Sequence, residues 1–277
     1  MKADRTRMSH DNRPIGIFDS GLGGLTVVAA IKNLLPHENI IYLGDTARVP
    51  YGNKSAQNIT KFGLSNSSFL ISKNVKMIVI ACNSVSAVAI EAIKSEYPKI
   101  PIMGVIEAGV SACTKHNPSH ITVTGTRATI NSGIYEKSIK QYDQSITVDS
   151  IPCPLFVPLA EEGIDNETII QATIELYLPE LKNTGKKQLL LLGCTHYPLL
   201  KQPISQYVHE NVTIIDSANA CAQYTKQFII DHSLQNEDQE HPLIQFYVTD
   251  KPAEFRTQSS RFFGHSIETI NIVELNY

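Results

Sequence analysis

The sequence lacks several features that would assign a protein to a class at once. It has no tryptophan, and no apolar run approaches the roughly 20 residues that a membrane-spanning helix needs. The polar stretch over residues 1–13 lacks the apolar core of a secretory signal, so we expect a frayed extension there. Lysine plus arginine (24) does not exceed aspartate plus glutamate (27), and the net charge of −3 favours neither nucleic acid nor membrane partners.

Cysteine is scarce, and its pattern argues against structural disulfides. The count is odd, no pair has C-x-x-C spacing, and a chain of 277 residues does not need disulfides for stability. We therefore expect free thiols in a reducing cytoplasm. The nine histidines are scattered without metal-like spacing, so no metal site is predicted. With 42% hydrophobic and 18% charged residues, the composition is that of a folded protein with one large domain or two modest ones.

Short apolar runs alternate with longer helical stretches along the chain. Several of the runs are continuously apolar, as in parallel strands buried on both faces, and the alternation predicts a mainly parallel, doubly wound α/β fold. The expected strands are Ile15–Phe18, Ile40–Leu43, Val75–Ala81, Ile102–Val105, Ile121–Thr124, Ser145–Ile151, Leu189–Leu192, Val212–Ile215 and Ile244–Val248. The expected helices include Leu25–Asn33, Gln57–Ser72, Ser86–Glu96, Asn131–Gln141, Asn166–Leu181 and Cys221–His232.

Two pairs of similar segments indicate an internal repeat, which predicts two related α/β halves. The segment Val75–Ser84 resembles Lys187–His196, since each has an apolar strand, a small residue, a cysteine and then polar residues. A weaker match pairs Ile15–Ser20 with Ile121–Thr126 at nearly the same offset. The repeat places the two cysteines at equivalent strand ends, and open α/β sheets bind ligands at such ends. We expect a cleft between the two halves.

The cysteines of this repeat, Cys82 and Cys194, are the main candidates for chemistry. Each follows a predicted strand where a helix could begin, and the free N–H groups and dipole of a helix N-terminus lower a thiol pKa. An isolated cysteine is more often a buried structural residue. Two in matching contexts are hard to explain as core residues, whereas Cys113, Cys153 and Cys221 lack that context and are interpreted as structural.

Two facing thiols suit one reaction in particular. Inverting an amino-acid α-carbon requires one group that removes the α-proton and a second that returns a proton to the opposite face. One thiolate and one thiol can do this, and their roles exchange when the reaction runs backwards. The sequence therefore favours a racemase that needs no cofactor.

Polar clusters follow other predicted strands. The glycine-rich turn after Asp19 and Ser20 could hold a carboxylate, but Thr26 replaces the third glycine of a dinucleotide fingerprint. Asp19 itself is a candidate helix cap, a residue that orients a thiol, or a partner for an ammonium group. The loop Asp45–Gly52 and the turn Gly125–Thr129 suit a small zwitterion, although turn chemistry and helix capping explain both equally well.

Two further polar positions are ambiguous. His196 is either a satisfied polar residue or, as an imidazolium two residues after Cys194, a stabiliser of a thiolate. Glu161 and Glu162 could be solvated acids at a helix start.

Four motifs together resemble the glutamate racemases. They are Ile15–Thr26, Tyr42–Gly52, Ala81–Ser84 and Leu192–Pro198, and the resemblance runs from about Ile15 to beyond Pro198. It implies two flavodoxin-like α/β domains, pseudo-symmetric, with the active site between them. It also implies conversion of L-glutamate to D-glutamate for bacterial peptidoglycan, without pyridoxal phosphate or a metal, and a homodimer is expected by analogy.

The resemblance also assigns roles to residues. Cys82 would act on the D-enantiomer and Cys194 on the L-enantiomer, with Asp19, His196 and Glu161 as auxiliary catalytic residues. The implied substrate contacts are Asp19, Ser20, Pro50, Tyr51, Gly52, Cys82, Asn83, Ser84, Thr126, Thr129, Cys194, Thr195 and His196. One departure is Ser84, where the family usually has threonine. The hydroxyl is kept, so substrate binding is expected to survive.

The order of elements predicts the domain boundaries. Residues 1–13 form the extension, residues 14–105 with 219–277 form one α/β domain, and residues 106–218 form the other. The nearest alternative function is an aspartate or other amino-acid racemase with the same two cysteines. A protein that regulates DNA gyrase, and a zinc site built from Cys82, Cys194 and a histidine, are more distant alternatives.

Overall fold

The computed structural model describes residues 11–236 and 242–275. Its strands are β1 (Ile15–Asp19), β2 (Ile40–Gly44), β3 (Met77–Ile80), β4 (Ile102–Gly104), β5 (His120–Gly125), β6 (Thr147–Pro152), β7 (Gln188–Gly193), β8 (Val212–Asp216), β9 (Ile244–Val248) and β10 (Ile270–Ile272). Its α-helices are α1 (Leu25–Leu34), α2 (Ala56–Ser72), α3 (Asn83–Val88), α4 (Ile90–Glu96), α5 (Val105–Thr114), α6 (Arg127–Asn131), α7 (Ile134–Tyr142), α8 (Phe156–Glu162), α9 (Glu167–Tyr177), α10 (Pro179–Lys182), α11 (Lys201–Tyr207), α12 (Ser217–Asp231) and α13 (Pro252–Phe263). Two 3₁₀ helices, η1 (Tyr51–Asn53) and η2 (Tyr197–Leu200), complete the set.

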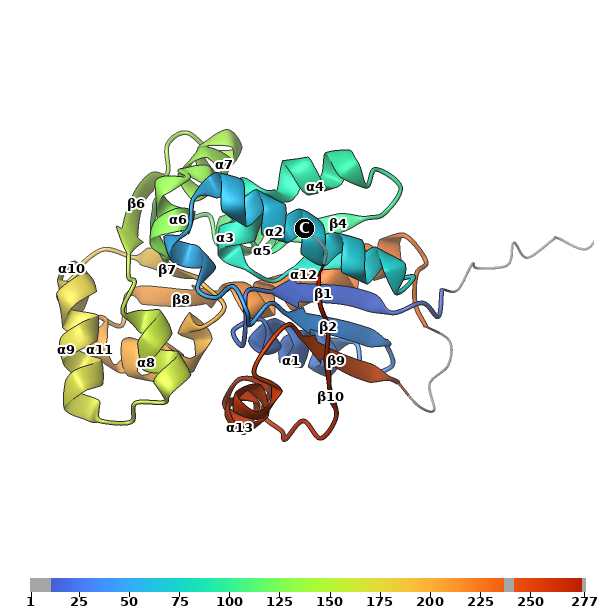
Figure 1. The fold of residues 1–277 in the computed structure, drawn as a ribbon. Helices are drawn as coiled ribbons and strands as arrows, with labels where there is room; N and C mark the ends of the chain where they lie inside the picture. The colour runs from blue at the N-terminus through green and yellow to red at the C-terminus, as the bar shows by residue number, and fades with distance from the viewer. Residues whose placement is uncertain (1–10, 237–241, 276–277) are drawn as a thin grey trace, which may run out of the picture.

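The strands form two parallel sheets that lie on either side of the molecule's centre (Figure 1). One has the order β10-β9-β2-β1-β3-β4, and the other has the order β6-β5-β7-β8. The segment β2-β1-β3-β4 therefore has the same connectivity as β6-β5-β7-β8. This is the strand order of a flavodoxin-like fold, whose ligands bind where the order reverses, outside the first and third strands. The predicted α/β class and the internal repeat are confirmed.

Alternating side chains bury both faces of the larger sheet. Ile15 and Ile17 of β1 pack with α1, α12 and α13, whereas Phe18 packs on the other face with α2 and α3. All five residues of β1 are buried. A strand covered by helices on both faces can be apolar at every position, and this is why the sequence shows continuous apolar runs.

The smaller sheet repeats this construction. Leu190 and Leu192 of β7 pack against α8–α11, and Leu189 and Leu191 pack against α5 and α7. Burying a leucine side chain contributes about 1.5–3 kcal/mol, so the run of leucines in β7 anchors the second sheet. The chain that leaves the carboxyl end of β7 is consequently held firmly at Gly193 and Cys194.

The expected elements agree with the structure in type and differ in their ends. All nine predicted strands are present, and β10, a short and largely exposed edge strand, was not predicted. Three predicted helices are each interrupted: at Ala89 between α3 and α4, at Gly133 before α7, and at Leu178 before α10. Gly133 has a φ of 66°, a left-handed conformation that glycine adopts without strain.

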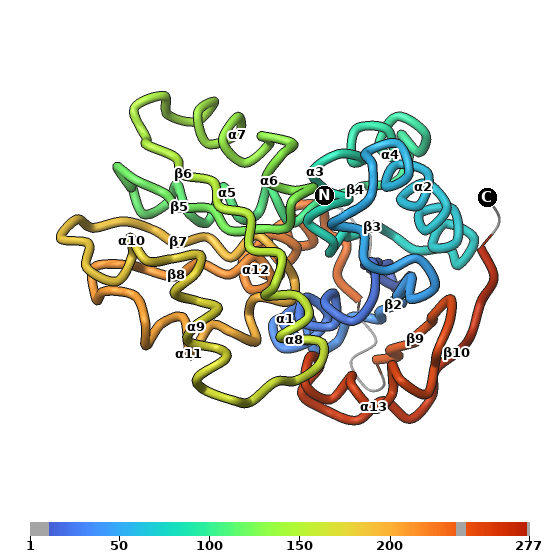
Figure 2. Tube along the Cα trace, turned by 60° about the vertical axis from the view of Figure 1, so that its left-hand side comes forward, coloured from blue at the N-terminus to red at the C-terminus, as the bar shows by residue number. Residues whose placement is uncertain are grey.

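Two helices carry the chain between the sheets. The helix α5 follows β4 into the second half, and α12 returns from β8 to the first half (Figure 2). They pack against each other. The predicted domain boundaries near residues 105 and 218 fall at these helices, and the division into domains stays a prediction. Of the predicted extension, residues 1–10 lie outside the described residues, and the Asp11 carbonyl accepts a hydrogen bond from Lys76 Nζ.

No helix within the described residues is long and apolar enough to cross a membrane.

Candidate active site

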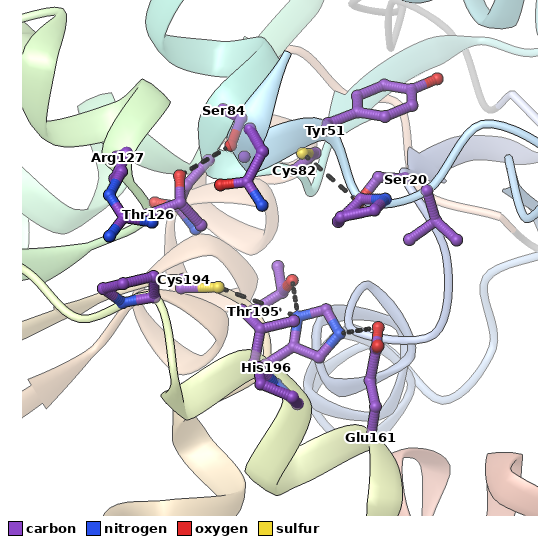
Figure 3. Close-up of a pocket in the computed structure, with 18 of the residues that line it drawn as sticks. Ser20, Tyr51, Cys82, Ser84, Thr126, Arg127, Glu161, Cys194, Thr195 and His196 are labelled. Carbon is purple, nitrogen blue, oxygen red and sulfur yellow. Dashed lines mark hydrogen bonds and ion pairs between the residues drawn. The ribbon is translucent and has the colours of Figure 1, made fainter. Parts of the chain in front are cut away.

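A cavity of about 520 Å³ opens at the carboxyl ends of the central strands, between the two halves (Figure 3). Residues that follow β1, β2, β3, β5 and β7 line it. The predicted site residues in its lining are Ser20, Pro50, Tyr51, Gly52, Cys82, Asn83, Ser84, Thr126, Glu161, Cys194, Thr195 and His196. The repeat thus brings its two cysteines to one cavity from opposite sides.

Cys82 ends the β3 segment and caps the N-terminus of α3. Its thiol lies 3.9 Å from Ser20 Oγ. Burial raises the pKa of Cys82 to about 12, and the nearby Asp19 carboxylate adds to this, although a hydrogen bond from the Val85 backbone opposes it. The expectation that the helix N-terminus lowers the pKa of this thiol is therefore wrong, because desolvation and a neighbouring negative charge outweigh it. In this environment Cys82 is a protonated thiol at neutral pH.

Cys194 follows β7 in the equivalent position but has different neighbours. A turn and the 3₁₀ helix η2 follow it, and no α-helix begins there as one does at Cys82. Its sulfur lies 3.8 Å from His196 Nδ1, and His196 Nε2 lies 2.9 Å from Glu161 Oε1. The chain Cys194–His196–Glu161 gives the second thiol an imidazole partner, whereas the side-chain partner of the Cys82 thiol is the Ser20 hydroxyl.

The charge of His196 follows from these contacts. Burial alone would lower the pKa of His196, but its hydrogen bonds and charge interactions with Cys194 and Glu161 raise it to about 10. An imidazolium at neutral pH places positive charge 3.8 Å from the Cys194 sulfur. The two halves thus place a carboxylate near one thiol and an imidazolium beside the other.

The glycine-rich turn after β1 contacts the second cysteine's segment directly. A Cβ on Gly23 would lie 2.3 Å from Thr195 Oγ1 and 2.5 Å from His196 Nδ1, distances that no side chain tolerates. Thr26 Oγ1 donates a hydrogen bond to the Thr195 carbonyl at 2.9 Å. The absence of a side chain at Gly23 therefore allows the first half to hold Thr195 and His196 in place.

A buried network behind the cavity fixes the wall formed by the loop after β2. The Tyr51 hydroxyl donates to Asp45, and Arg48 Nε lies 2.5 Å from the same carboxylate oxygen. Asn66 Nδ2 donates to the Tyr51 hydroxyl at 3.2 Å, and Thr249 Oγ1 donates to Asp45 at 2.9 Å. Burial and the Asp45 carboxylate raise the pKa of Tyr51 far above its ordinary value, so this hydroxyl stays protonated. The backbone of residues 50–52 is consequently held rigidly against the cavity.

Hydroxyl groups from both halves meet on the remaining wall. Ser84 Oγ, at the start of α3, lies 3.0 Å from Thr126 Oγ1, and Thr126 caps α6 by accepting from the Thr129 backbone N–H. Capping explains why Thr126 stands where it does, and it leaves the hydroxyl at the cavity edge. The Ser84 hydroxyl thus joins the two halves at this wall.

Comparisons with known proteins agree with this geometry. A family model described as Asp/Glu/Hydantoin racemase matches residues 25–225. The chain belongs to this racemase family. A glutamate racemase of Neisseria meningitidis is 43% identical over 95% of this chain and 97% of its own length.

Two solved structures extend the comparison. The glutamate racemase of Francisella tularensis in complex with D-glutamate has a TM-score of 0.88 and 40% identity, covering 95% of this chain and 98% of its own. The RacE1 glutamate racemase of Bacillus anthracis has a TM-score of 0.90 and 33% identity, covering 96% and 98%. The resemblance to glutamate racemases is confirmed over nearly the whole chain.

Two predicted site residues of this racemase lie outside the cavity lining. Asp19 is fully buried behind it, where its Oδ2 accepts from the Gly21 N–H at 3.0 Å. Thr129 is also buried, and its hydroxyl lies 3.0 Å from Thr126 Oγ1. Neither residue belongs to the cavity lining, and their contact with substrate stays a prediction.

The cavity also contains residues that the sequence did not single out. They are Val49, Asn53, Arg127, Pro154, Leu155, Val157, Pro158 and Tyr177. Val49, Asn53 and Arg127 are adjacent to predicted residues in the chain, whereas the other four before Tyr177 lie in α8 or just ahead of it, on the segment that also carries Glu161. Tyr177, at the end of α9, gave no signal in the sequence. Of the two candidate acids in α8, Glu161 faces His196 whereas Glu162 is exposed.

Among the described residues, no group of three histidine, cysteine, aspartate or glutamate side chains is arranged to hold a metal ion. The five cysteines are all buried and free. Burial raises the pKa of Cys113 and Cys221 to about 12, as expected for thiols in a structural environment.

Proposed function

We propose that this racemase interconverts L- and D-glutamate by a two-thiol reaction, without a cofactor. The observation that carries the proposal is the equivalence of Cys82 and Cys194. They follow the corresponding strands β3 and β7 of the two repeats and line one cavity. Two acid/base groups presented to one substrate from two related halves are suited to proton transfer at opposite faces of one carbon.

In the L-to-D direction, the Cys194 thiolate removes the α-proton and becomes a thiol. The electron pair of the broken C–H bond is delocalised into the substrate carboxylate, and the Cys82 thiol gives its proton to the opposite face. Cys82 is left as the thiolate. The His196 imidazolium supports the starting charge on Cys194, and Glu161 keeps that imidazole protonated and oriented.

The D-to-L direction runs the same steps in reverse and needs Cys82 as the thiolate. The Asp19 carboxylate raises the pKa of Cys82, and its Oδ1 is buried with no hydrogen-bond partner in the described structure. A substrate ammonium group near Asp19 would offset this negative charge and favour the Cys82 thiolate. Asp19 can therefore couple substrate binding to the charge state of the thiol.

The choice of glutamate as substrate rests on the relatives. This chain matches glutamate racemases over almost their full length. Arg127 and His196 supply positive charge to the cavity lining for a substrate with two carboxylates. Aspartate, one methylene shorter, is the alternative substrate. We further propose that the enzyme is cytoplasmic and that its D-glutamate supplies peptidoglycan synthesis.

The proposal is tested by following the circular dichroism of L-glutamate and of L-aspartate with purified, metal-free, reduced protein. Decay of the L-glutamate signal to zero, with aspartate turning over at least about tenfold more slowly, supports the assignment. Faster turnover of aspartate would keep the chemistry and replace the substrate. No change with either amino acid would overturn the proposed function.

A further inference from the structure

The side-chain amide of Asn83 has one end satisfied and the other end unsatisfied. Asn83 is the first residue of α3, directly after Cys82, and only 2% of it is exposed. Its Oδ1 accepts a hydrogen bond of 2.7 Å from the Tyr135 hydroxyl. Its Nδ2 is buried without a hydrogen-bond partner in the described structure, although Asn83 belongs to the cavity lining.

The hydroxyl of Tyr135 decides which end of the amide is left for the cavity. Within the described residues, the phenol proton has no acceptor other than Asn83 Oδ1. If the amide were turned over, the hydroxyl would lose that acceptor and the cavity would receive a carbonyl oxygen instead of an N–H. Because an unsatisfied buried hydroxyl is unfavourable, the observed orientation is preferred.

The Tyr135 ring is itself held by close packing. It is buried at the start of α7, and a Cβ on Gly193 of β7 would lie 3.0 Å from Tyr135 Cε2. A Cβ on Gly109 of α5 would lie 3.5 Å from its hydroxyl oxygen. The ring therefore occupies a slot between β7 and α5, and its hydroxyl points across to the other half of the molecule.

We propose that Tyr135 is a positioning residue for substrate binding, one that aims the Asn83 N–H group at a carboxylate of the amino-acid substrate. The inference rests on the proposed racemase function and extends it to a residue outside the cavity lining. A neutral N–H donor is suited to a carboxylate oxygen, whereas the carbonyl oxygen of a turned amide would repel it. Since Asn83 and Tyr135 belong to different halves, their hydrogen bond also ties the halves together beside Cys82.

The test is the Tyr135→Phe variant, which keeps the ring in its slot and removes only the hydroxyl. We expect KM for both enantiomers to rise about tenfold while kcat changes less than about threefold, as for the loss of one oriented hydrogen bond. Tyr247→Phe is the matched control. Its hydroxyl makes only a long, 3.4 Å contact with Gln245 on β9, away from the cavity, so its KM should equal that of the wild type.

A double-mutant cycle separates positioning from a general structural effect. In an Asn83→Ala background, Tyr135→Phe should change KM by less than about twofold, because no amide remains to be oriented. An unchanged KM in Tyr135→Phe alone, or the full increase in the Asn83→Ala background, would overturn the inference.

A second variant serves if Tyr135→Phe does not fold. Asn83→Asp keeps an acceptor for Tyr135 and presents an oxygen to the substrate, so KM should rise more than about tenfold. An unchanged KM there would overturn the inference. The wild type is assayed first. If it is active and the variants have an unchanged KM, this inference alone is contradicted. If the wild type is inactive on glutamate, the proposed function is contradicted and this inference with it.

Discussion

His196 bridges Cys194 and Glu161, with Nδ1 lying 3.8 Å from the cysteine sulfur and Nε2 lying 2.9 Å from the glutamate Oε1. The corresponding thiol of the first half, Cys82, has the carboxylate of Asp19 near it and no imidazole contact among the described residues. The two halves share a strand order but surround their thiols with opposite charges. This asymmetry makes kcat and KM of the two directions sensitive to different substitutions, while kcat/KM stays equal in both directions because the two enantiomers have the same free energy.

Replacing Glu161 by glutamine should move the alkaline limit of the L-to-D reaction. Glu161 raises the pKa of His196, so its neutral replacement lowers that pKa from about 10 and the imidazolium is lost at a lower pH. In this variant, the alkaline decrease of kcat for L-glutamate should begin at a lower pH than in the wild type. The corresponding shift for D-glutamate should be smaller. A pH profile of kcat, measured at saturating substrate in each direction, tests this. Equal shifts in both directions would contradict the separate role of His196. Glu162→Gln, on the exposed neighbour, is the matched control.

The stability of the protein should depend on the same histidine. Its pKa is raised above the unfolded value of about 6.5, so its contribution is complete below pH 6.5 and is lost as the pH rises toward 10. The free energy of unfolding, measured in urea at pH 6.5 and at pH 9, should therefore be lower at the higher pH. This difference in free energy should be smaller in His196→Gln. A decrease of the same size in His196→Gln would assign the pH dependence to other groups.

Each cysteine of the cavity should be required for racemisation. Cys82→Ala and Cys194→Ala should each lower the rate in both directions by at least about 10³-fold, because one of the two proton-transfer groups is missing. Thermal melting should be nearly unchanged, because removing one sulfur leaves the fold in place. Cys113→Ala, a buried thiol outside the cavity, is the control and should stay active. A Cys82 or Cys194 variant that keeps full activity in both directions would refute the two-thiol model.

Adding one methyl group at Gly23 should damage the site from the opposite half. The new Cβ would lie 2.3 Å from Thr195 Oγ1, so Thr195 and His196 must shift. Because small displacements of catalytic groups are costly, we expect kcat/KM to fall about 100-fold in Gly23→Ala. Gly185→Ala is the control, since nothing lies within 4 Å of its Cβ position. Gly23→Ala with wild-type kinetics would show that this contact does not position the site.

Much of the fold could be predicted because its strands are buried on both faces. Continuous apolar runs marked several of the nine predicted strands, although β6 is partly exposed and mixed in composition, and the repeat followed from two matching strand ends. The interruptions of the helices were less visible. Ala89 carries no local breaking signal, whereas Leu178 precedes a proline, a position disfavoured in helices that the sequence could have revealed.

The site was predictable in its residues and less so in its electrostatics. Strand ends and the family motifs identified both cysteines, His196 and Glu161. The raised pKa of Cys82 depends on burial and on the approach of Asp19, and neither is visible in the order of residues. Tyr135 was missed for the same reason, because its contact with Asn83 joins segments that are distant in the chain.

The most direct test of the two-thiol account is racemisation of L-glutamate in D₂O, stopped early. Solvent deuterium enters the α-position from the thiol that protonates the product, while the proton taken from the substrate stays on the other thiol. The account predicts that the D-glutamate formed carries α-deuterium and that the remaining L-glutamate does not, as measured by mass spectrometry after chiral separation. Deuterium appearing equally fast in the remaining L-glutamate would indicate a single base and would contradict the account.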